Sequence, residues 1–202
     1  MPKVAEEHFA ARRRQILDAA AACFAREGFH RTSMQDIVRE SGISAGLIYR
    51  YFTGKDDMIA AIVAEWHERR TSLLGEDPAA GFLQVLRAVG DPANRAELSL
   101  AVQVWAETVR SPHIRDVARD NVDRPRRFAA AALAGAAPEP DALARVLIAI
   151  YQGLVLQTLW DDGVDHAAYV RAVAALLAPL GLLPADTAAP ESVAPQEAQR
   201  PG

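Results

Sequence analysis

The feature that most constrains the fold is a pair of short segments within residues 33–52 that are joined by a tight turn. Ile37 in the first segment and Phe52 at the end of the second can point toward a shared apolar core. Gly42 lies in the turn between them, where glycine tolerates the left-handed backbone that a sharp reversal requires. Two short helices joined in this way are typical of a helix-turn-helix, whose second helix enters the major groove of DNA.

A longer helix is predicted before this pair, over residues 6–27, with Gly28 as its left-handed C-terminal cap. Its apolar residues fall on one face at spacings of three and four: Ile16, Leu17, Ala20, Cys23 and Phe24. The next helix begins at either Thr32 or Ser33, because each is followed three residues later by a side chain that completes a capping box. The sequence leaves this choice open.

The rest of the chain also favours helices, separated by Gly and Pro, and shows no strand pattern. Helices are predicted over residues 44–52, 55–74, 78–89, 92–110, 112–134, 141–160 and 166–180. Pro125 falls inside one of them and is expected to kink or interrupt it. We therefore predict an all-α protein of about nine helices. It is divided into an N-terminal three-helix helix-turn-helix domain (residues 10–70), a larger helical domain (71–183) and a disordered tail (184–202).

Charge is unevenly distributed along the chain, whose formal net charge is −4. Residues 1–55 carry a net charge of +3, and residues 56–202 carry a net charge of −7. A mildly basic N-terminal segment (the head, residues 1–55) before an acidic remainder indicates that only the head binds a polyanion such as DNA. A solvent-exposed basic face that binds nothing would have the same composition. Three of the head's arginines, Arg12, Arg13 and Arg14, are interpreted as a solvated helix end rather than as DNA contacts.

The single cysteine, Cys23, excludes an internal disulfide and fits a reducing compartment. Because it lies on the apolar stripe, we interpret it as core filler rather than as a redox sensor. The sequence has neither a signal-peptide pattern nor a long uncharged apolar run. We therefore expect a cytoplasmic protein with no membrane partner.

The motifs of common enzyme classes are missing from the sequence. The five histidines show no metal-ligand spacing such as H-E-x-x-H, and there is neither a G-x-S-x-G nucleophile motif nor a phosphate-binding glycine loop. We therefore expect no enzyme, with no catalytic residue, no metal and no cofactor. The alternative to a DNA-binding regulator is a helical ligand-binding or interaction module that does not bind DNA.

Residues 10–70 resemble the DNA-binding domain of the TetR family of transcriptional regulators, in order and without gaps. The resemblance is carried by Arg14 to Ala20, Phe24, Glu27 to Phe29, Thr32 to Ile37, Ser41 to Gly46, Ile48 to Phe52 and Lys55 to Met58. The remainder of the chain matches the family's divergent helical effector domain only in size and helix pattern. The resemblance implies a dimeric regulator, more often a repressor than an activator, that binds a palindromic operator in double-stranded DNA.

The resemblance also implies roles for individual residues. The positions that hold DNA phosphates match Thr32 or Ser33, Ser44, Tyr49, Tyr51 and Lys55. The positions that face base edges match Ala45, Gly46 and Arg50. Arg50 can donate two hydrogen bonds to a guanine, whereas Leu47 departs from the family pattern and either touches a thymine methyl or packs inward. Because Tyr49 and Tyr51 are two residues apart, one of them can instead belong to the core.

The larger domain is predicted to bind an effector and to dimerise. Its last two helices form a hairpin with more apolar surface than a single subunit can bury. Two such hairpins, one from each subunit, would form a four-helix bundle. The expected dimer interface is Val146, Ile150, Leu154, Gln157, Val170, Val173, Leu177 and Leu180. The side chains expected to line a pocket for a small hydrophobic or amphipathic effector of unknown identity are Trp66, Phe82, Leu86, Trp105, Phe128, Tyr151 and Gln152. Both sets have a simpler alternative as ordinary monomer core.

Overall fold

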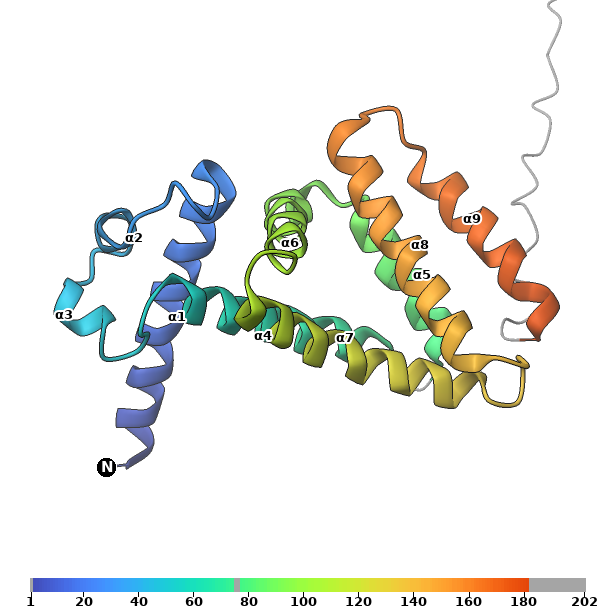
Figure 1. Ribbon diagram of the computed structural model, residues 1–202, viewed down its shortest axis with the longest axis horizontal. Helices are drawn as coiled ribbons and strands as arrows, with labels where there is room; N and C mark the ends of the chain where they lie inside the picture. Colours follow the sequence, from blue (N-terminus) through green and yellow to red (C-terminus); the bar gives the residue numbers. More distant parts are fainter. Residues whose placement is uncertain (1, 75–76, 182–202) are drawn as a thin grey trace, which may run out of the picture.

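The computed structural model describes residues 2–74 and 77–181, and within these ranges the chain is helical apart from turns and loops (Figure 1). The helices of the described ranges are α1 (Pro2–Glu27), α2 (Met34–Ser41), α3 (Ala45–Ile48), α4 (Lys55–Leu74), α5 (Pro78–Val89), α6 (Arg95–Glu107), α7 (Pro112–Leu133), α8 (Pro140–Trp160) and α9 (His166–Leu177). Two short 3-10 helices are η1 (Pro92–Asn94) and η2 (Ala178–Leu180). The prediction of an all-α protein is confirmed, while the tail predicted over residues 184–202 lies outside the described residues.

The N-terminal core is formed by α1, α2, α3 and the first part of α4, with a contribution from α6. Phe24 of α1, Ile37 of α2 and Ile48 of α3 are fully buried, so each helix contributes its apolar face. The stripe predicted on α1, including Cys23, lies in this core, and burial raises the pKa of the Cys23 thiol. The thiol therefore stays protonated at neutral pH and packs as a small apolar side chain.

Ser33 is the N-cap of α2, which decides the register that the sequence left open. Its Oγ accepts a hydrogen bond from the Asp36 backbone N–H at 3.2 Å, and its own backbone N–H donates to the Asp36 carboxylate at 2.8 Å. α2 ends before Gly42, whose φ of +67° is left-handed and whose N–H donates to Val38 O at 3.1 Å. These local bonds fix the direction in which the chain leaves α2 toward α3.

The Asp36 carboxylate makes the stability of this unit depend on pH. Hydrogen bonds from the Ser33 hydroxyl and backbone N–H, together with nearby Arg39, hold the Asp36 pKa below its ordinary value of 3.8. Such a carboxyl adds stability above the unfolded-state pKa and loses it as the pH falls through the folded-state pKa. We expect Asp36→Asn to lower the urea midpoint at neutral pH, and the difference from wild type to shrink as the pH falls below 3.8. A difference that persists unchanged in acid would contradict a role for the charge.

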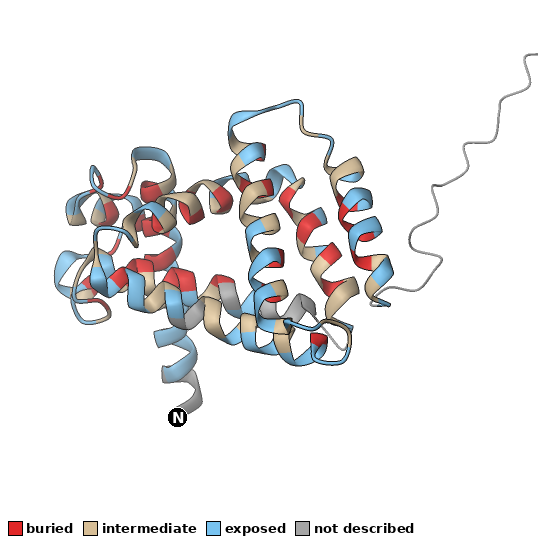
Figure 2. Cartoon of the chain, turned by 45° about the vertical axis from the view of Figure 1, so that its right-hand side comes forward, coloured by how far each residue is buried: buried red, intermediate tan, exposed pale blue. Residues whose placement is uncertain are grey.

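A second core is formed by α5, α8 and α9 with parts of α6 and α7. Leu86 of α5 and Leu154 and Val155 of α8 are fully buried in it. Figure 2 shows buried residues on the inward sides of these helices and exposed residues on their outer sides. α8 is long and apolar enough to cross a membrane by length and composition, yet here it packs against α5, α6 and α7. On its outer side, away from those helices, Val146 and Trp160 are exposed.

The two cores are joined by α4 and α6. α4 contacts α1, α5 and α7, and it runs across the domain boundary predicted at residue 70. α6 contacts both α1 and α8. Gln103 Oε1 of α6 accepts a hydrogen bond from the Phe29 N–H at 3.1 Å, and the Glu107 carboxylate pairs with His30 at 2.7 Å. The turn between α1 and α2 is therefore bonded directly to α6.

Two helices differ from their predicted extents. α3 ends at Ile48 rather than near Phe52, because the Arg50 and Tyr51 amides donate to carbonyls three residues back, at 3.1 and 2.9 Å. α7 continues through Pro125 without interruption, so a break at that residue is wrong. A proline removes one hydrogen bond from a helix interior, and the other turns of this 22-residue helix hold it together.

Candidate nucleic-acid interface and adjoining cavity

The surface at the tip of the helix-turn-helix is formed by α3 and the turn after it, at the left end of the molecule in Figure 1. Its exposed residues are Ser44, Ala45, Gly46, Tyr49 and Arg50. On the opposite side, Ile48 and Phe52 are buried in the N-terminal core. Leu47 is partly buried and packs against the same core, which supports the packing role among its two predicted ones. The exposed residues therefore share one face.

This face offers the chemical groups that DNA binding requires. Tyr49 is 55% exposed, and Ser44 caps α3 without using its side chain. Arg50 is exposed and forms no ion pair within the described part of the chain. Hydroxyls can donate to phosphates, and an unpaired guanidinium can donate to the edge of a base. One exposed helical turn can thus hold the DNA backbone and read a base.

Gly46 leaves open space on this face, since a Cβ at this position meets no atom within 4 Å. Alanine therefore fits the folded chain and should stabilise α3 by up to about 1 kcal/mol. If the α3 backbone approaches DNA closely at Gly46, the added methyl group occupies that contact. We expect Gly46→Ala to raise the urea midpoint slightly while weakening operator binding by about 1.4 kcal/mol, which is tenfold.

Urea unfolding and fluorescence anisotropy with labelled operator DNA measure the two effects of Gly46→Ala. Gly135→Ala is the matched control, because a Cβ at Gly135 also meets nothing within 4 Å and the residue lies in the loop between α7 and α8. Wild-type affinity in Gly46→Ala would contradict a close approach of the backbone to DNA.

Thr32, by contrast, lies inside the protein. It is 1% exposed, and its Oγ1 donates a hydrogen bond to Gly28 O at 2.9 Å. The prediction of Thr32 as a phosphate ligand is therefore wrong, because its hydroxyl is enclosed in the turn between α1 and α2. Ser33 is exposed, although its hydroxyl takes part in the capping box, and its contact with a phosphate stays a prediction.

Lys55, at the start of α4, is partly buried and clamps the turn between α1 and α2. Its Nζ donates to Phe29 O at 2.8 Å and to Thr32 O at 2.7 Å, and it lies 4.8 Å from the centre of the Phe29 ring. An ammonium group has three N–H donors, so one remains for the predicted phosphate contact. No local pattern signals this clamp, because the two carbonyls lie 26 and 23 residues earlier in the chain.

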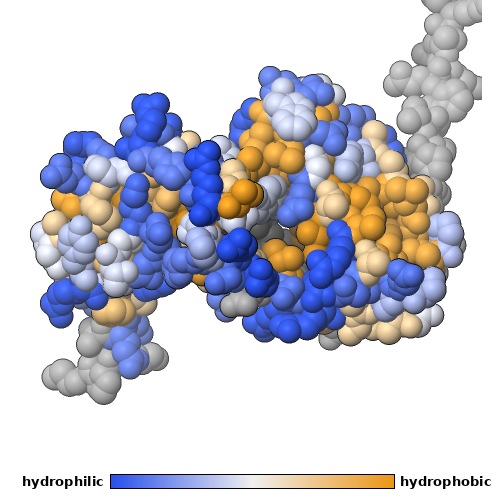
Figure 3. All heavy atoms as spheres, in the orientation of Figure 1, coloured by the Kyte–Doolittle hydropathy of each residue, from blue (hydrophilic) through white to orange (hydrophobic). Residues whose placement is uncertain are grey.

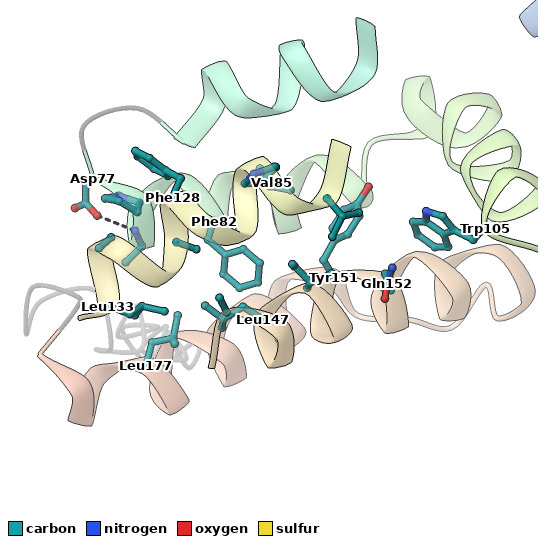
Figure 4. Close-up of a pocket in the computed structure, with 18 residues that line it drawn as sticks. Asp77, Phe82, Val85, Trp105, Phe128, Leu133, Leu147, Tyr151, Gln152 and Leu177 are labelled. Carbon is teal, nitrogen blue, oxygen red and sulfur yellow. Dashed lines mark hydrogen bonds between the residues drawn. The ribbon is translucent and has the colours of Figure 1, made fainter. Parts of the chain in front are cut away.

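A cavity of about 240 Å³ lies among α5, α6, α7 and α8 (Figure 4). Five of the seven predicted pocket residues line it: Phe82, Trp105, Phe128, Tyr151 and Gln152. Trp66 instead lies in the N-terminal core and is 7% exposed, while Leu86 is fully buried in the second core. These two predictions are wrong, because a large apolar side chain at helical spacing fills a core as readily as it lines a cavity.

One wall of the cavity is a stripe of α8 that was only partly predicted from the sequence. The missed residues are Ala144, Leu147 and Ile148. With Tyr151 and Gln152 they follow the three- and four-residue spacing of one helix face, and that period was the available signal. Asp77 is the one charged residue among the described lining residues, and its carboxylate caps α5 through the Ala79 and Ala80 N–H groups at 3.0 Å. The cavity therefore suits a mainly apolar ligand.

The outer face of α8 and α9 is apolar, but its residues differ from the predicted interface. Figure 3 shows apolar surface on the right of the molecule, where α8 and α9 lie in Figure 1. Val146 is 52% exposed, and Trp160 and Leu176, which were not predicted, are 72% and 68% exposed. Gln157 is exposed as predicted.

Several predicted interface residues instead belong to the core of their own chain. The buried ones are Leu154, Val170, Val173 and Leu177, and Ile150 and Leu180 are partly buried against them. Their assignment to an interface is corrected, because their side chains fill the space between α5, α8 and α9. Helical periodicity marks the apolar sides of a helix, but it does not say which side faces the core.

The fold and the site together define a helix-turn-helix regulator whose helical body contains an apolar cavity. Residues 16–62 match the family described as bacterial regulatory proteins, tetR family, and residues 78–181 match the one described as BetI-type transcriptional repressor, C-terminal. The chain belongs to the TetR family and is a DNA-binding transcriptional regulator. The resemblance seen in residues 10–70 is thereby confirmed.

Individual relatives extend this similarity over most of the chain. The HTH-type transcriptional repressor Rv1474c of Mycobacterium tuberculosis is 32% identical over 138 residues, covering 63% of this chain and 73% of the relative. The structure of Salmonella enterica GusR has a TM-score of 0.70 at 26% identity, covering 85% of this chain and 96% of that one. A transcriptional regulator from Saccharomonospora viridis, solved in complex with choline, has a TM-score of 0.69 at 26% identity, covering 84% and 96%.

Proposed function

We propose that the protein is a repressor that binds a palindromic operator as a homodimer and releases it when a small, mainly apolar ligand enters the cavity. The observation that carries the proposal is the exposed face of α3, where hydroxyls, a guanidinium and an open glycine lie together. Repression is supported by the repressor descriptions of the C-terminal family and of Rv1474c. We expect it to act on the chromosome in the bacterial cytoplasm, without catalytic activity of its own.

The proposed dimer uses the outer faces of α8 and α9. Val146, Trp160 and Leu176 expose large apolar side chains there, and covering such surface contributes about 25 cal/mol per Å². Two copies joined through these faces would form a four-helix bundle. A two-fold axis between them would direct two α3 helices at successive turns of one face of a duplex.

Sedimentation velocity tests this interface. Trp160→Glu places a charge on the uncovered face, so we expect it to shift the protein from dimer to monomer. Val109→Glu is the matched control, because Val109 is 83% exposed and lies outside α8 and α9. A Trp160→Glu protein that remains dimeric at the concentrations where wild type is dimeric would contradict the proposed face.

The cavity supports a ligand with an apolar body, and choline is the first compound to titrate because the Saccharomonospora viridis relative was solved with it. Phe82, Phe128, Trp105 and Tyr151 line the cavity, and aromatic faces attract quaternary ammonium groups. Trp105 lies on α6, which is bonded to the turn between α1 and α2 through Gln103. A ligand that shifts α6 or α4 would therefore change the position of α3.

Selection of duplexes from a random-sequence library, followed by mobility-shift assays at two salt concentrations, tests the whole proposal. We expect a consensus with two inverted halves and an affinity that falls steeply with salt, because phosphate contacts release counterions. Choline, or an uncharged apolar analogue, should lower the bound fraction. Failure to bind any duplex at low salt would favour a helical ligand-binding or interaction module without DNA binding.

A further inference from the structure

The N-terminal end of α1 extends beyond both cores. Residues 6–11 are all exposed, and the buried stripe of this helix begins only at Ile16. Figure 1 shows this end of α1 projecting from the N-terminal unit, past α3. Phe9 lies on it and is 54% exposed. A large aromatic side chain at this place has no core to fill, so its contacts call for another explanation.

Phe9 stacks on Tyr51, with ring centroids 4.5 Å apart and an interplanar angle of 28°. Four residues further along α1, the Arg13 guanidinium lies 5.5 Å from the centre of the Phe52 ring and pairs with Glu65 at 2.6 Å. Residues four apart share one face of a helix. One face of α1 therefore contacts two consecutive residues that follow α3.

The chain after α3 depends on such support, because α3 has only four residues and a single helical turn is not stable by itself. Phe52 is anchored by burial in the N-terminal core. Tyr51 is only partly buried, and its hydroxyl makes no hydrogen bond within the described residues. The ring of Phe9 covers one side of the Tyr51 ring and so limits the directions in which that hydroxyl can point.

We propose that Phe9 is a positioning residue for DNA binding: its ring holds Tyr51 so that the Tyr51 hydroxyl meets a DNA phosphate. Phe9 itself touches no DNA and acts through the stacked ring. The inference rests on the proposed function, in which Tyr51 is one of the groups that contact the operator. It assigns a role to the exposed end of α1, which the helix-turn-helix alone does not explain.

Fluorescence anisotropy with a duplex that the wild-type protein selects from a random library tests this role. We expect Phe9→Ala and Tyr51→Phe each to weaken binding about three- to tenfold, which is the range for one hydrogen bond. The double variant should bind no more weakly than either single one, because both changes remove the same contact. Phe9→Tyr, which keeps the stacked ring, should bind like wild type, whereas Phe9→Leu, which is apolar but has no ring, should not.

Thermal unfolding and Val109→Ala serve as controls. Val109 is 83% exposed, so its truncation shows what the loss of an exposed apolar side chain does by itself. We expect Phe9→Ala to lower the unfolding midpoint only slightly, because Phe9 is half-exposed and a single stacked aromatic pair contributes little to stability. Wild-type affinity for DNA in Phe9→Ala or in Tyr51→Phe overturns the proposal. It is also overturned if the two losses of affinity add in the double variant, or if Phe9→Leu binds as tightly as wild type. A wild-type protein that selects no duplex would instead overturn the proposed function itself.

Discussion

Replacing Lys55 with alanine is expected to lower the free energy of unfolding by about 2–4 kcal/mol, because hydrogen bonds to a charged group contribute about 1.5–3 kcal/mol each and water reaches part of this site. The change leaves the Phe29 and Thr32 carbonyls without the ammonium that bonds both. It also removes the cation from the face of the Phe29 ring. Urea unfolding of the purified protein measures the loss.

Arg31→Ala is the control for Lys55→Ala. Arg31 is an exposed cation in the same turn and forms no ion pair within the described residues, so its removal changes charge without breaking the clamp. We expect the free energy of unfolding of Arg31→Ala to lie within about 0.5 kcal/mol of the wild-type value. If Lys55 served only as a phosphate ligand, Lys55→Ala would be as stable as wild type, and the slope of log affinity against log salt would fall by about 0.9. That result would contradict the clamp.

Arg50→Ala is expected to weaken binding to the best operator by about 1–3 kcal/mol and to flatten the preference at one base pair in each half-site. Arg50 is exposed beside α3, and nothing in the described residues neutralises it. Its guanidinium is therefore available to a guanine edge. Affinities for a panel of duplexes, each carrying one base-pair change from the selected consensus, measure both effects.

The panel also separates base reading from phosphate binding. A phosphate contact has the same strength on every sequence, so equal losses on all duplexes would contradict the base-reading role of Arg50. Arg39→Ala is the matched control, since Arg39 is an exposed arginine of α2 whose partner is Asp36. We expect Arg39→Ala to leave the ranking of the duplexes unchanged.

Local chemistry explains why the helix-turn-helix could be predicted from the sequence. The capping box of Ser33 and the left-handed turn at Gly42 each depend on side chains or backbone within a few residues. The same holds for the apolar stripe of α1, which follows the period of one helix. These signals fixed the order of the helices and the exposed face of α3, although not which of the two capping boxes forms.

The remaining features depend on contacts between distant parts of the chain. The turn between α1 and α2 folds against the start of α4. For this reason Thr32 is buried, and Lys55 bonds the carbonyls of the turn. On α8, apolar residues lie on both the core side and the outer side, so periodicity alone assigned Leu154 to the wrong one. Trp66 was misplaced for a similar reason, since packing between α4 and α1 decides whether it meets a core or a cavity.

The shortness of α3 limits what one subunit can recognise. At about 1.5 Å per residue, the six residues from Ala45 to Arg50 extend at most roughly 9 Å, which is about three base-pair steps of DNA. A DNA sequence of that length recurs by chance throughout a genome, which offers ~10⁶–10⁹ competing sites. In the proposed dimer this short sequence would be read twice, once by each subunit, so the spacing between the two half-sites would add to the specificity that their bases provide.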